Sequence, residues 1–377
     1  MFVAVPFYTY AITGSVTATA AVALAEYAPA VGIAQLAGLL VDRWDSRRVI
    51  VWVNLALAAC TLAYLLHEAW WWFAVVAFAR SCVAQFVLPA AQTLVPATAP
   101  AGRLTEVNGA NTIGGNIARL AGPALGGLVL GLGGLHAVAI ADAASFIVAA
   151  VLTAAIRLPR ITSRTSREGL LHAWRTGWST VRDHPVLGPL AVVMALVGIG
   201  EGFVSALLAP WMADIAGGDS THLGLMLSLQ AVGGILGGIA VVRAHRLPTL
   251  SMLWIGALTS GTLLVVILNY PLLAPVGPWP AILLTAVAGF PFAVYGTAQA
   301  IAVQTYSSDG IRGRIVSLTF GIQGIAQLAG TALAGPAAAL LGPLAINVEA
   351  LAYLAAGALS LATVRRSRSQ RAPSSTN

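Results

Sequence analysis

Lysine is absent from this 377-residue chain, and charged residues of every kind make up only 9% of it. Soluble domains carry about a quarter charged residues. The hydrophobic share is 58% and the mean hydropathy is +0.84. A water-facing surface cannot be covered from this composition, so the chain is predicted to be an integral membrane protein. The use of arginine alone, with abundant alanine and glycine, is typical of a high-GC bacterial source.

Cysteine is equally scarce. Cys60 and Cys82 both lie in apolar stretches, which argues against a disulfide framework, and no histidine or cysteine pair has metal-ligand spacing. The sequence contains no H-E-x-x-H, G-x-S-x-G or G-x-x-x-x-G-K-[ST] motif. These absences argue against an enzyme and against ATP-driven pumping, and we expect no metal and no cofactor.

Long apolar stretches are what the chain has in excess. A membrane-spanning helix needs about 20 mostly apolar residues. Eleven stretches of the chain reach this length, and one more, residues 1–12, is only about half as long. We therefore expect a first helix that is truncated at its N-terminus and a natural start further upstream. The eleven complete stretches have the approximate limits 16–41, 49–67, 70–94, 105–131, 133–156, 186–212, 222–242, 249–269, 279–304, 313–341 and 343–364.

The arginines test this division. When the spans alternate in direction, eighteen of the twenty arginines fall on one side, and the other two, Arg80 and Arg119, lie within spans. Cytoplasmic loops carry such an excess of positive charge. The pattern predicts an all-α, twelve-helix protein of the bacterial cytoplasmic (inner) membrane with its C-terminus in the cytoplasm. It also explains the pI of about 10.0 without a nucleic-acid partner.

The chain divides into two related halves. The segment Ile117–Gly127 matches Ile325–Gly335 at eight of eleven positions, in the fifth and eleventh spans. Parallel repeats of this kind occur in one large transporter fold. The predicted domains are an N-terminal six-helix bundle, a cytoplasmic linker with an amphipathic helix, a C-terminal six-helix bundle and a basic cytoplasmic tail, over 1–156, 157–184, 185–364 and 365–377.

Two local motifs also point to a transporter. The loop after the second span fits the pattern G-x-x-x-D-R-x-G-x-R-R, except that Asp45 replaces the second glycine. The fifth span contains the Gly-Pro segment LAGPALGG. The residues that carry the two motifs are Gly38, Asp42, Arg43, Arg47 and Arg48 in the loop, and Gly122, Pro123, Gly126 and Gly127 in the fifth span.

On these motifs the chain resembles the major facilitator superfamily, with the drug, macrolide and siderophore exporters as the nearest in character. The resemblance implies a 6+6 two-bundle fold, a cytoplasmic gate at the loop motif and an antiporter-like motif in the fifth span. Asp42 is then expected to hold the two halves together against the positive N-terminal end of the eleventh span. The arginines of the loop either complete that charge network or only anchor the topology.

Ionisable side chains at bilayer depth cost at least about 2.5–3.5 kcal/mol and usually face a cavity or a partner. By the resemblance, the fourth and seventh helices line the central cavity, which makes Arg80 and Glu201 the first candidates for proton or substrate binding. Glu26 and Arg119 are further candidates. Asp142 and Glu349, on the sixth and twelfth helices, are expected to be structural. The six candidates are Glu26, Arg80, Arg119, Asp142, Glu201 and Glu349.

Glycines and aromatic residues extend these expectations. The pairs Gly233–Gly237 and Gly234–Gly238 in the eighth span have the small-x-x-x-small spacing of close helix packing. Aromatic residues of the seventh and tenth spans either line an apolar cavity or contact lipid and neighbouring helices; they are Phe203, Trp211, Phe290, Phe292 and Tyr295.

The predicted function is secondary active export of a small amphipathic organic molecule, driven by the proton motive force, by a monomer in the lipid bilayer. A facilitator or importer of the same fold and a non-transporting sensor or scaffold are the alternatives. The sequence leaves open the substrate, the direction of transport and the coupling ion.

Overall fold

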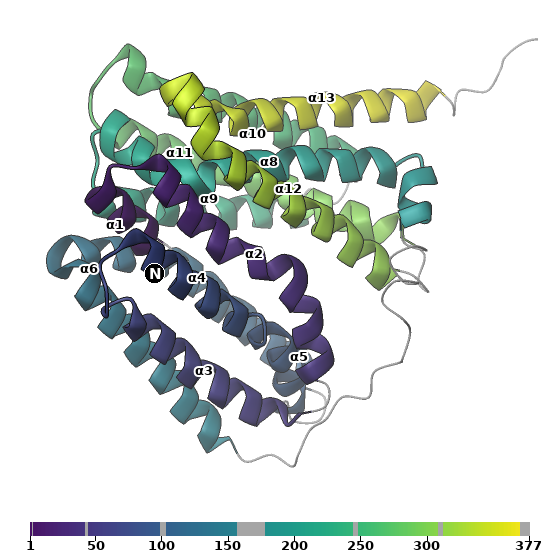
Figure 1. The fold of residues 1–377 in the computed structure, drawn as a ribbon. Helices are drawn as coiled ribbons and strands as arrows, with labels where there is room; N and C mark the ends of the chain where they lie inside the picture. Colours follow the sequence, from purple (N-terminus) through teal and green to yellow (C-terminus); the bar gives the residue numbers. More distant parts are fainter. Residues whose placement is uncertain are drawn as a thin grey trace, which may run out of the picture. The chain divides into compact units, whose positions relative to one another are not determined.

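The computed structural model describes residues 1, 3–41, 44–98, 103–156, 178–243, 248–307 and 312–369. Within these ranges every regular element is a helix, as predicted (Figure 1). The helices form two compact units. Unit 1 comprises residues 1–167 and 218–228, and unit 2 comprises 168–217 and 229–377. This division by contacts does not test the four domain limits that the sequence predicts, which stay a prediction.

Unit 1 is built around the contacts of α2 with α4 and of α3 with α6. Apolar side chains such as Val22 and Phe73 are fully buried between these helices. Gly14 ends the first helix at a φ of 58°, a conformation that glycine adopts without strain. The helices are α1 (Ala4–Thr13), α2 (Val16–Val41), α3 (Ser46–Ala63), α4 (Trp70–Ala84), α5 (Val87–Thr98), α6 (Leu104–Ala155) and the first turns of α9 (Ser220–Arg243).

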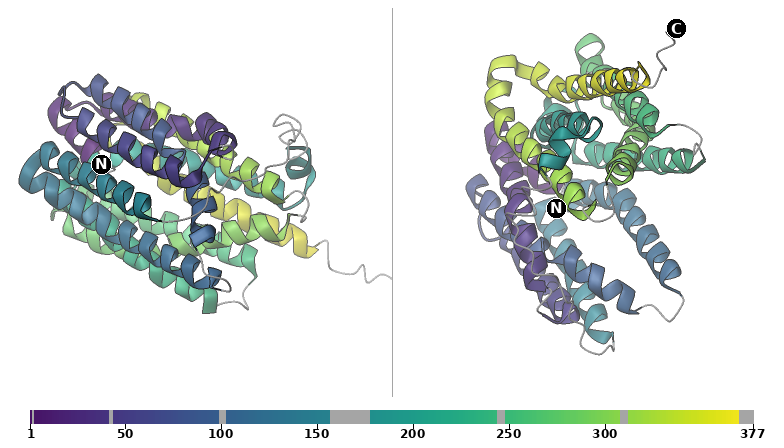
Figure 2. Two further views of the ribbon diagram at one scale, coloured as in Figure 1. Left: turned by 90° about the horizontal axis from the view of Figure 1, so that it is seen from below. Right: turned by 90° about the vertical axis from the view of Figure 1, so that its right-hand side faces the viewer.

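Unit 2 is centred on α8, which packs against both α12 and α13, while α10 packs against α11 and α13. Its long helices lie side by side (Figure 2). The elements are α8 (Leu187–Pro210), the π-helical turn η1 (Trp211–Ile215), the remainder of α9, α10 (Thr249–Leu273), α11 (Trp279–Thr305), α12 (Arg312–Leu341), the 3-10 turn η2 (Gly342–Asn347) and α13 (Val348–Ser369).

Nine helical segments of the described residues are long and apolar enough to cross a membrane. Two of them, of 43 and 51 residues, are more than twice the length that one crossing needs. The first contains a break at Gly134, whose φ is 65°, and the second contains η2. Divided there, the nine segments become eleven and match the eleven stretches read from the sequence. The remaining helix, α1, has ten residues, and the count of twelve stays a prediction.

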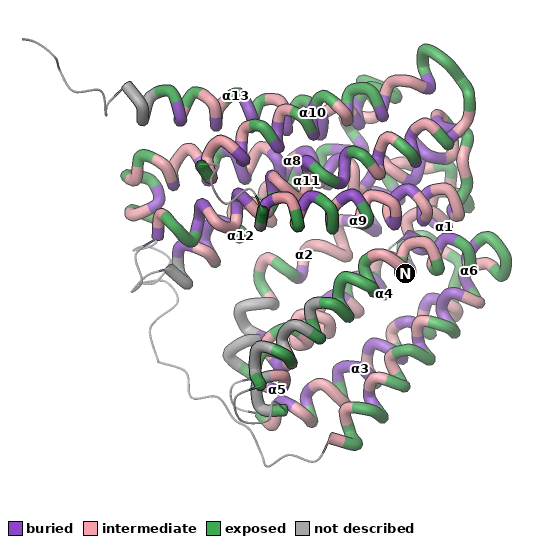
Figure 3. Tube along the Cα trace, turned by 180° about the vertical axis from the view of Figure 1, so that it is seen from behind, coloured by how far each residue is buried: buried purple, intermediate pink, exposed green. Residues whose placement is uncertain are grey.

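Exposed residues recur along the helices (Figure 3), and many of them are large and apolar. Leu132, Leu273 and Leu340 are each more than 80% exposed. In water such a surface would cause aggregation, whereas in a bilayer it meets lipid. The exposed surface therefore agrees with the membrane location predicted from the composition.

The predicted amphipathic linker helix falls mostly on residues 157–177, outside the described part of the chain. The residues that follow are described: 178–183 are helical, and Val181 is buried.

Candidate functional site

Helices of unit 2 line an open cavity of about 530 Å³. Its wall contains two carboxyl groups, four glutamine amides and four aromatic rings, contributed by five helices. No basic residue is among the twelve lining residues, all of which belong to the described part of the chain. They are Glu201 of α8, Gln230 of α9, Phe292, Tyr295, Gly296 and Gln299 of α11, Phe320, Gln323, Gly324 and Gln327 of α12, and Glu349 and Tyr353 of α13.

Glu201 is held by a chain of two amides. The side-chain Nε2 of Gln299 donates to Oε1 of Gln323 at 2.8 Å, and Nε2 of Gln323 donates to Oε2 of Glu201 at 3.2 Å. Because Gln299 occupies the carbonyl of Gln323, the amide group of Gln323 faces the carboxyl group. The polar groups that fix Glu201 are therefore neutral, and its charge has no basic counter-ion in the cavity wall.

Three glycines of α8 decide how close Glu201 comes to its neighbours. A Cβ at Gly198 would lie 2.4 Å from the carbonyl oxygen of Gln323, and one at Gly202 would lie 2.2 Å from that of Gln327. A Cβ at Gly200 would lie 2.8 Å from the Cα of Glu349 on α13. Gly198 and Gly202 thus admit α12 and Gly200 admits α13. The glycines beside Glu201 are contact points between helices that bring polar groups of three helices to one place.

Glu349 lies in the same cavity as Glu201, although the sequence assigned it a structural role on a peripheral helix. Its side chain is buried, and so are the rings of Tyr295 and Tyr353, whose centroids are 5.4 Å apart. The hydroxyl of Tyr295 is buried and has no hydrogen-bond partner among the described residues. The cavity therefore combines two carboxyl groups, packed aromatic rings and an unused hydroxyl group.

Unit 1 holds its membrane-depth charges differently. Arg80 on α4 lies between two acids, 3.6 Å from Glu26 on α2 and 3.9 Å from Asp142 on α6. Thr61 on α3 donates to Asp142 at 3.4 Å. The side chains of these three ionisable residues are only 19–25% exposed. Two predicted site residues, Arg80 and Glu26, are thus paired in unit 1, and Asp142 joins them.

Arg119 has no place in that cluster. It is an exposed residue of α6, and no ion pair links it to any other described residue. Its predicted role as a counter-ion for one of the buried acids has no support in the described contacts.

The loop motif is described only in part. Asp42 and Arg43 lie outside the described residues, and Gly38 lies within α2. Arg47 donates to the carbonyl oxygens of Thr153, at 3.4 Å, and of Ala154, at the C-terminal end of α6. A cation there complements the negative end of the helix. The motif thus joins the start of α3 to the end of α6.

Asp45 explains how the loop tolerates its departure from the family pattern. Its φ of −69° and ψ of 109° are open to any residue, so glycine is not required. Its side chain accepts from the backbone N–H of Arg48 at 3.2 Å and caps α3. Aspartate at this position therefore caps α3, which the glycine of the family pattern could not do with a side chain.

The Gly-Pro motif of α6 contacts the first turns of α9 within unit 1. A Cβ at Gly127 would lie 2.3 Å from the carbonyl oxygen of Ser220, and one at Gly224 would lie 2.3 Å from that of Pro123. Ser220 donates to the carbonyl of Gly127 at 3.2 Å. Gly122 and Gly126, in contrast, have open space where a Cβ would be placed. The motif works here as a close helix contact that depends on some of its glycines.

The glycines of α9 divide in the same way. An added Cβ at Gly233 or Gly237 would lie 1.9 Å or 2.3 Å from a carbonyl oxygen of α11, whereas Gly238 meets nothing within 4 Å. Of the two predicted pairs, Gly233–Gly237 forms the tight contact.

Of the five aromatic candidates, some line the cavity and others do not. Phe292 and Tyr295 line the cavity. Phe203 is buried, and Trp211 is buried with its indole N–H donating to the carbonyl of Leu268 at 3.1 Å, while Phe290 is exposed. Only two of the five can therefore meet a molecule in the cavity.

The glutamines and Tyr353 were missed by the sequence interpretation. Polar side chains within apolar spans form hydrogen bonds between helices or line polar cavities, so each glutamine was a usable signal. The sequence candidates are all ionisable or aromatic residues or belong to the two motifs, and glutamine belongs to none of these groups.

Together the fold and this polar cavity inside an apolar helical bundle define a multi-pass membrane protein that binds small molecules, of the kind that transports them. The chain belongs to the Major Facilitator Superfamily, whose family model matches residues 1–331. The family and the efflux proteins among its sequence relatives place the chain among transporters and not among enzymes.

Among sequence relatives, the chain is 29% identical over 357 residues to "Multidrug efflux pump Tap" of Mycobacterium tuberculosis (strain ATCC 25618 / H37Rv), covering 89% of this chain and 82% of the relative. It is 24% identical over 345 residues to "Macrolide efflux protein A" of Streptococcus pyogenes, covering 88% and 83%. Among solved structures, nucleoside transporter NupG aligns with a TM-score of 0.72 at 13% identity, over 98% of this chain and 94% of that one. This last similarity shows the fold alone.

Proposed function

We propose that the protein exports a small amphipathic organic molecule in exchange for protons. The observation that carries the proposal is the carboxyl group of Glu201, placed in the cavity of unit 2 and held only by neutral amides. The names of the two relatives above, a macrolide efflux protein and a multidrug efflux pump, support export as the direction.

The chemistry follows from the missing counter-ion. An unpaired carboxylate at membrane depth is costly, so its charge is neutralised either by a proton or by a positive group of the substrate. Since one carboxyl group accepts only one of the two, binding of the first displaces the second. A protein that alternates between two conformations then exchanges protons for substrate. Phe292, Tyr295 and Tyr353 offer apolar surface for the body of an amphipathic molecule.

The test compares Glu201→Gln with Glu68→Gln in the full-length protein. Both changes remove one negative charge, but Glu68 is exposed just before α4 and outside the cavity. Cells carrying each variant are screened for resistance to dyes, macrolides and siderophores, and the best substrate is then followed in inside-out vesicles energised by a proton gradient. We expect Glu201→Gln to lose proton-driven uptake and Glu68→Gln to retain it.

Two results would contradict the proposal. Full proton-driven transport by Glu201→Gln would remove Glu201 from the coupling mechanism. Transport by the unchanged protein that runs only down the substrate gradient would favour a facilitator.

The setting of the protein is part of the proposal. The arginine distribution supports the bacterial inner membrane with a cytoplasmic C-terminus, and we propose that the protein acts as a monomer without a cofactor, with Asp42 at the cytoplasmic gate. A C-terminal fusion to a fluorescent protein that folds only in the cytoplasm should fluoresce, and a fusion to a periplasmic phosphatase should be inactive.

A further inference from the structure

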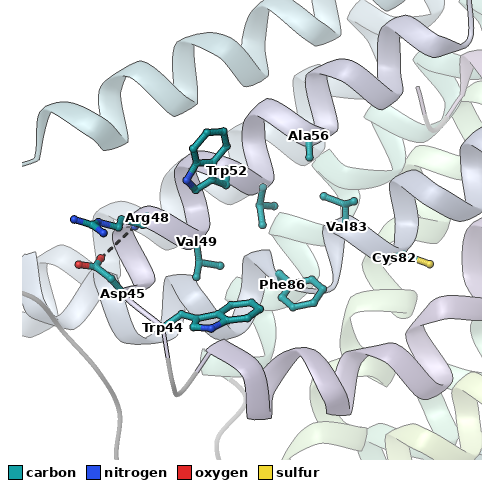
Figure 4. A pocket seen from close by; sticks show the side chains of 10 residues that line it. Trp44, Asp45, Arg48, Val49, Trp52, Ala56, Cys82, Val83 and Phe86 are labelled. Atoms are coloured by element: carbon teal, nitrogen blue, oxygen red, sulfur yellow. Dashed lines mark hydrogen bonds between the residues drawn. The ribbon is translucent and has the colours of Figure 1, made fainter.

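Unit 1 contains a groove of its own, apart from the cavity that holds Glu201. It has a volume of about 710 Å³ and lies between α3 and the C-terminal end of α4 (Figure 4). Its wall is mostly apolar and includes Trp44, Trp52, Val83 and Phe86, with Arg48 at one end. We call it the α3–α4 groove.

The groove is charged at one end only. Arg48 and Asp45 lie at that end, and Cys82 lies toward the other (Figure 4). Asp45 is occupied in capping α3. Arg48 forms no ion pair with another described residue, so its guanidinium group is the positive charge that this end of the groove offers to an anionic group.

The length of the groove fits one leaflet of a bilayer. The lining residues of α3 run from Arg48 to Ala56, a rise of eight residue steps or about 12 Å of helix. Half of the hydrocarbon core is about 15 Å thick. A molecule with a charged head at Arg48 and an apolar chain along α3 would therefore stay within the leaflet on that side.

Two exposed indole rings flank the groove. Trp44 is 49% and Trp52 is 70% exposed, and the two rings lie on opposite sides of the groove (Figure 4). Tryptophan is enriched where a membrane protein meets the lipid headgroups. Rings and arginine together match a molecule that has both an anionic head and an acyl body.

We propose that the α3–α4 groove binds an anionic glycerophospholipid, with its phosphate at Arg48 and one acyl chain between the two indole rings. The positive end selects against lipids without net negative charge. Because Arg48 belongs to the first turn of α3, a bound lipid rests against the segment that carries the loop motif.

The test measures quenching of tryptophan fluorescence by lipids with brominated acyl chains. The purified full-length protein is reconstituted in nanodiscs with brominated phosphatidylglycerol, phosphatidylcholine or phosphatidylethanolamine at equal mole fractions. We expect phosphatidylglycerol to quench more than the other two, and this excess to fall at least twofold in the Trp44→Phe, Trp52→Phe double variant.

Arginine variants show whether charge is responsible. Arg48→Gln should abolish the excess, while Arg48→Lys should retain most of it and shows that the fold tolerates change at this position. Arg103→Gln, which removes an exposed arginine outside the groove, should leave the excess intact. Equal quenching by the three lipids, a preference for phosphatidylethanolamine, or an unchanged excess in Arg48→Gln would overturn the proposal.

Discussion

The two units treat buried charge in opposite ways. In unit 1 one arginine, Arg80, lies within 4 Å of two acids, Glu26 and Asp142, so each acid has a basic partner. In unit 2 the two acids of the cavity, Glu201 and Glu349, face amides and aromatic rings and no base among the lining residues.

The difference suggests a division of labour between related halves. Asp142 and Glu349 each lie in the last helix of their half, yet Asp142 is paired with an arginine and Glu349 has no base among its fellow lining residues. A charge that is already paired gains little from a proton or a cationic substrate, whereas an unpaired one gains much. Unit 1 is therefore suited to a fixed structural role and unit 2 to an exchange of charge.

The strongest way to break the comparison is Arg80→Gln, which gives unit 1 the unpaired acids of unit 2. Removing one partner of a buried ion cluster costs about 3–5 kcal/mol, because it leaves uncompensated charge. We expect a large fall in the thermal unfolding midpoint in detergent and in the amount of protein in the membrane. Adding Glu26→Gln should restore part of the stability; a stable single variant would show that the cluster is not needed for folding.

The repeated segment offers a second comparison at equivalent glycines, Gly122 of α6 and Gly330 of α12. A Cβ at Gly330 would lie 2.2 Å from the carbonyl oxygen of Ile199, whereas one at Gly122 would meet nothing within 4 Å. Overpacking costs about 1–3 kcal/mol. Gly330→Ala should lower the unfolding midpoint and Gly122→Ala should leave it unchanged. Equal effects of the two changes would mean that the halves pack alike.

The comparison is sharpened by giving unit 2 the counter-ion that it lacks. Gln323→Arg would place a guanidinium group beside Glu201 and hold that charge in an ion pair. We expect proton-driven export to fall at least tenfold, equivalent to about 1.4 kcal/mol in the rate-limiting barrier. Gln304→Arg, an exposed position of α11, is the matched control. Retained export in Gln323→Arg would argue that an unpaired Glu201 is unnecessary.

The smallest effect is expected at the helix cap of unit 1. Asp45→Ala removes the side-chain acceptor of the Arg48 N–H and should cost about 1 kcal/mol, whereas Asp45→Asn should be nearly neutral. Unfolding midpoints of the two variants compare them directly. If both changes were equally harmful, the negative charge of Asp45 would matter more than its cap.

The sequence predicted much of the fold and only part of the candidate site. The eleven apolar stretches recur as helical segments because length and apolar composition are local properties. Glu201 was found because a lone acid in an apolar span is conspicuous. Glu349 lies 148 positions further along the chain, and only the close contact of α8 and α13 at Gly200 brings the two together.

Composition and pattern alone thus determined a helical membrane protein with two related halves, since lipid permits few other ways to satisfy the backbone. Tertiary structure alone decided which acids acquire a partner, which glycines of a repeated motif are indispensable and which neutral amides surround a carboxyl group. Those outcomes depend on the rotation and spacing of neighbouring helices, to within a few tenths of an ångström, and no local sequence pattern encodes them.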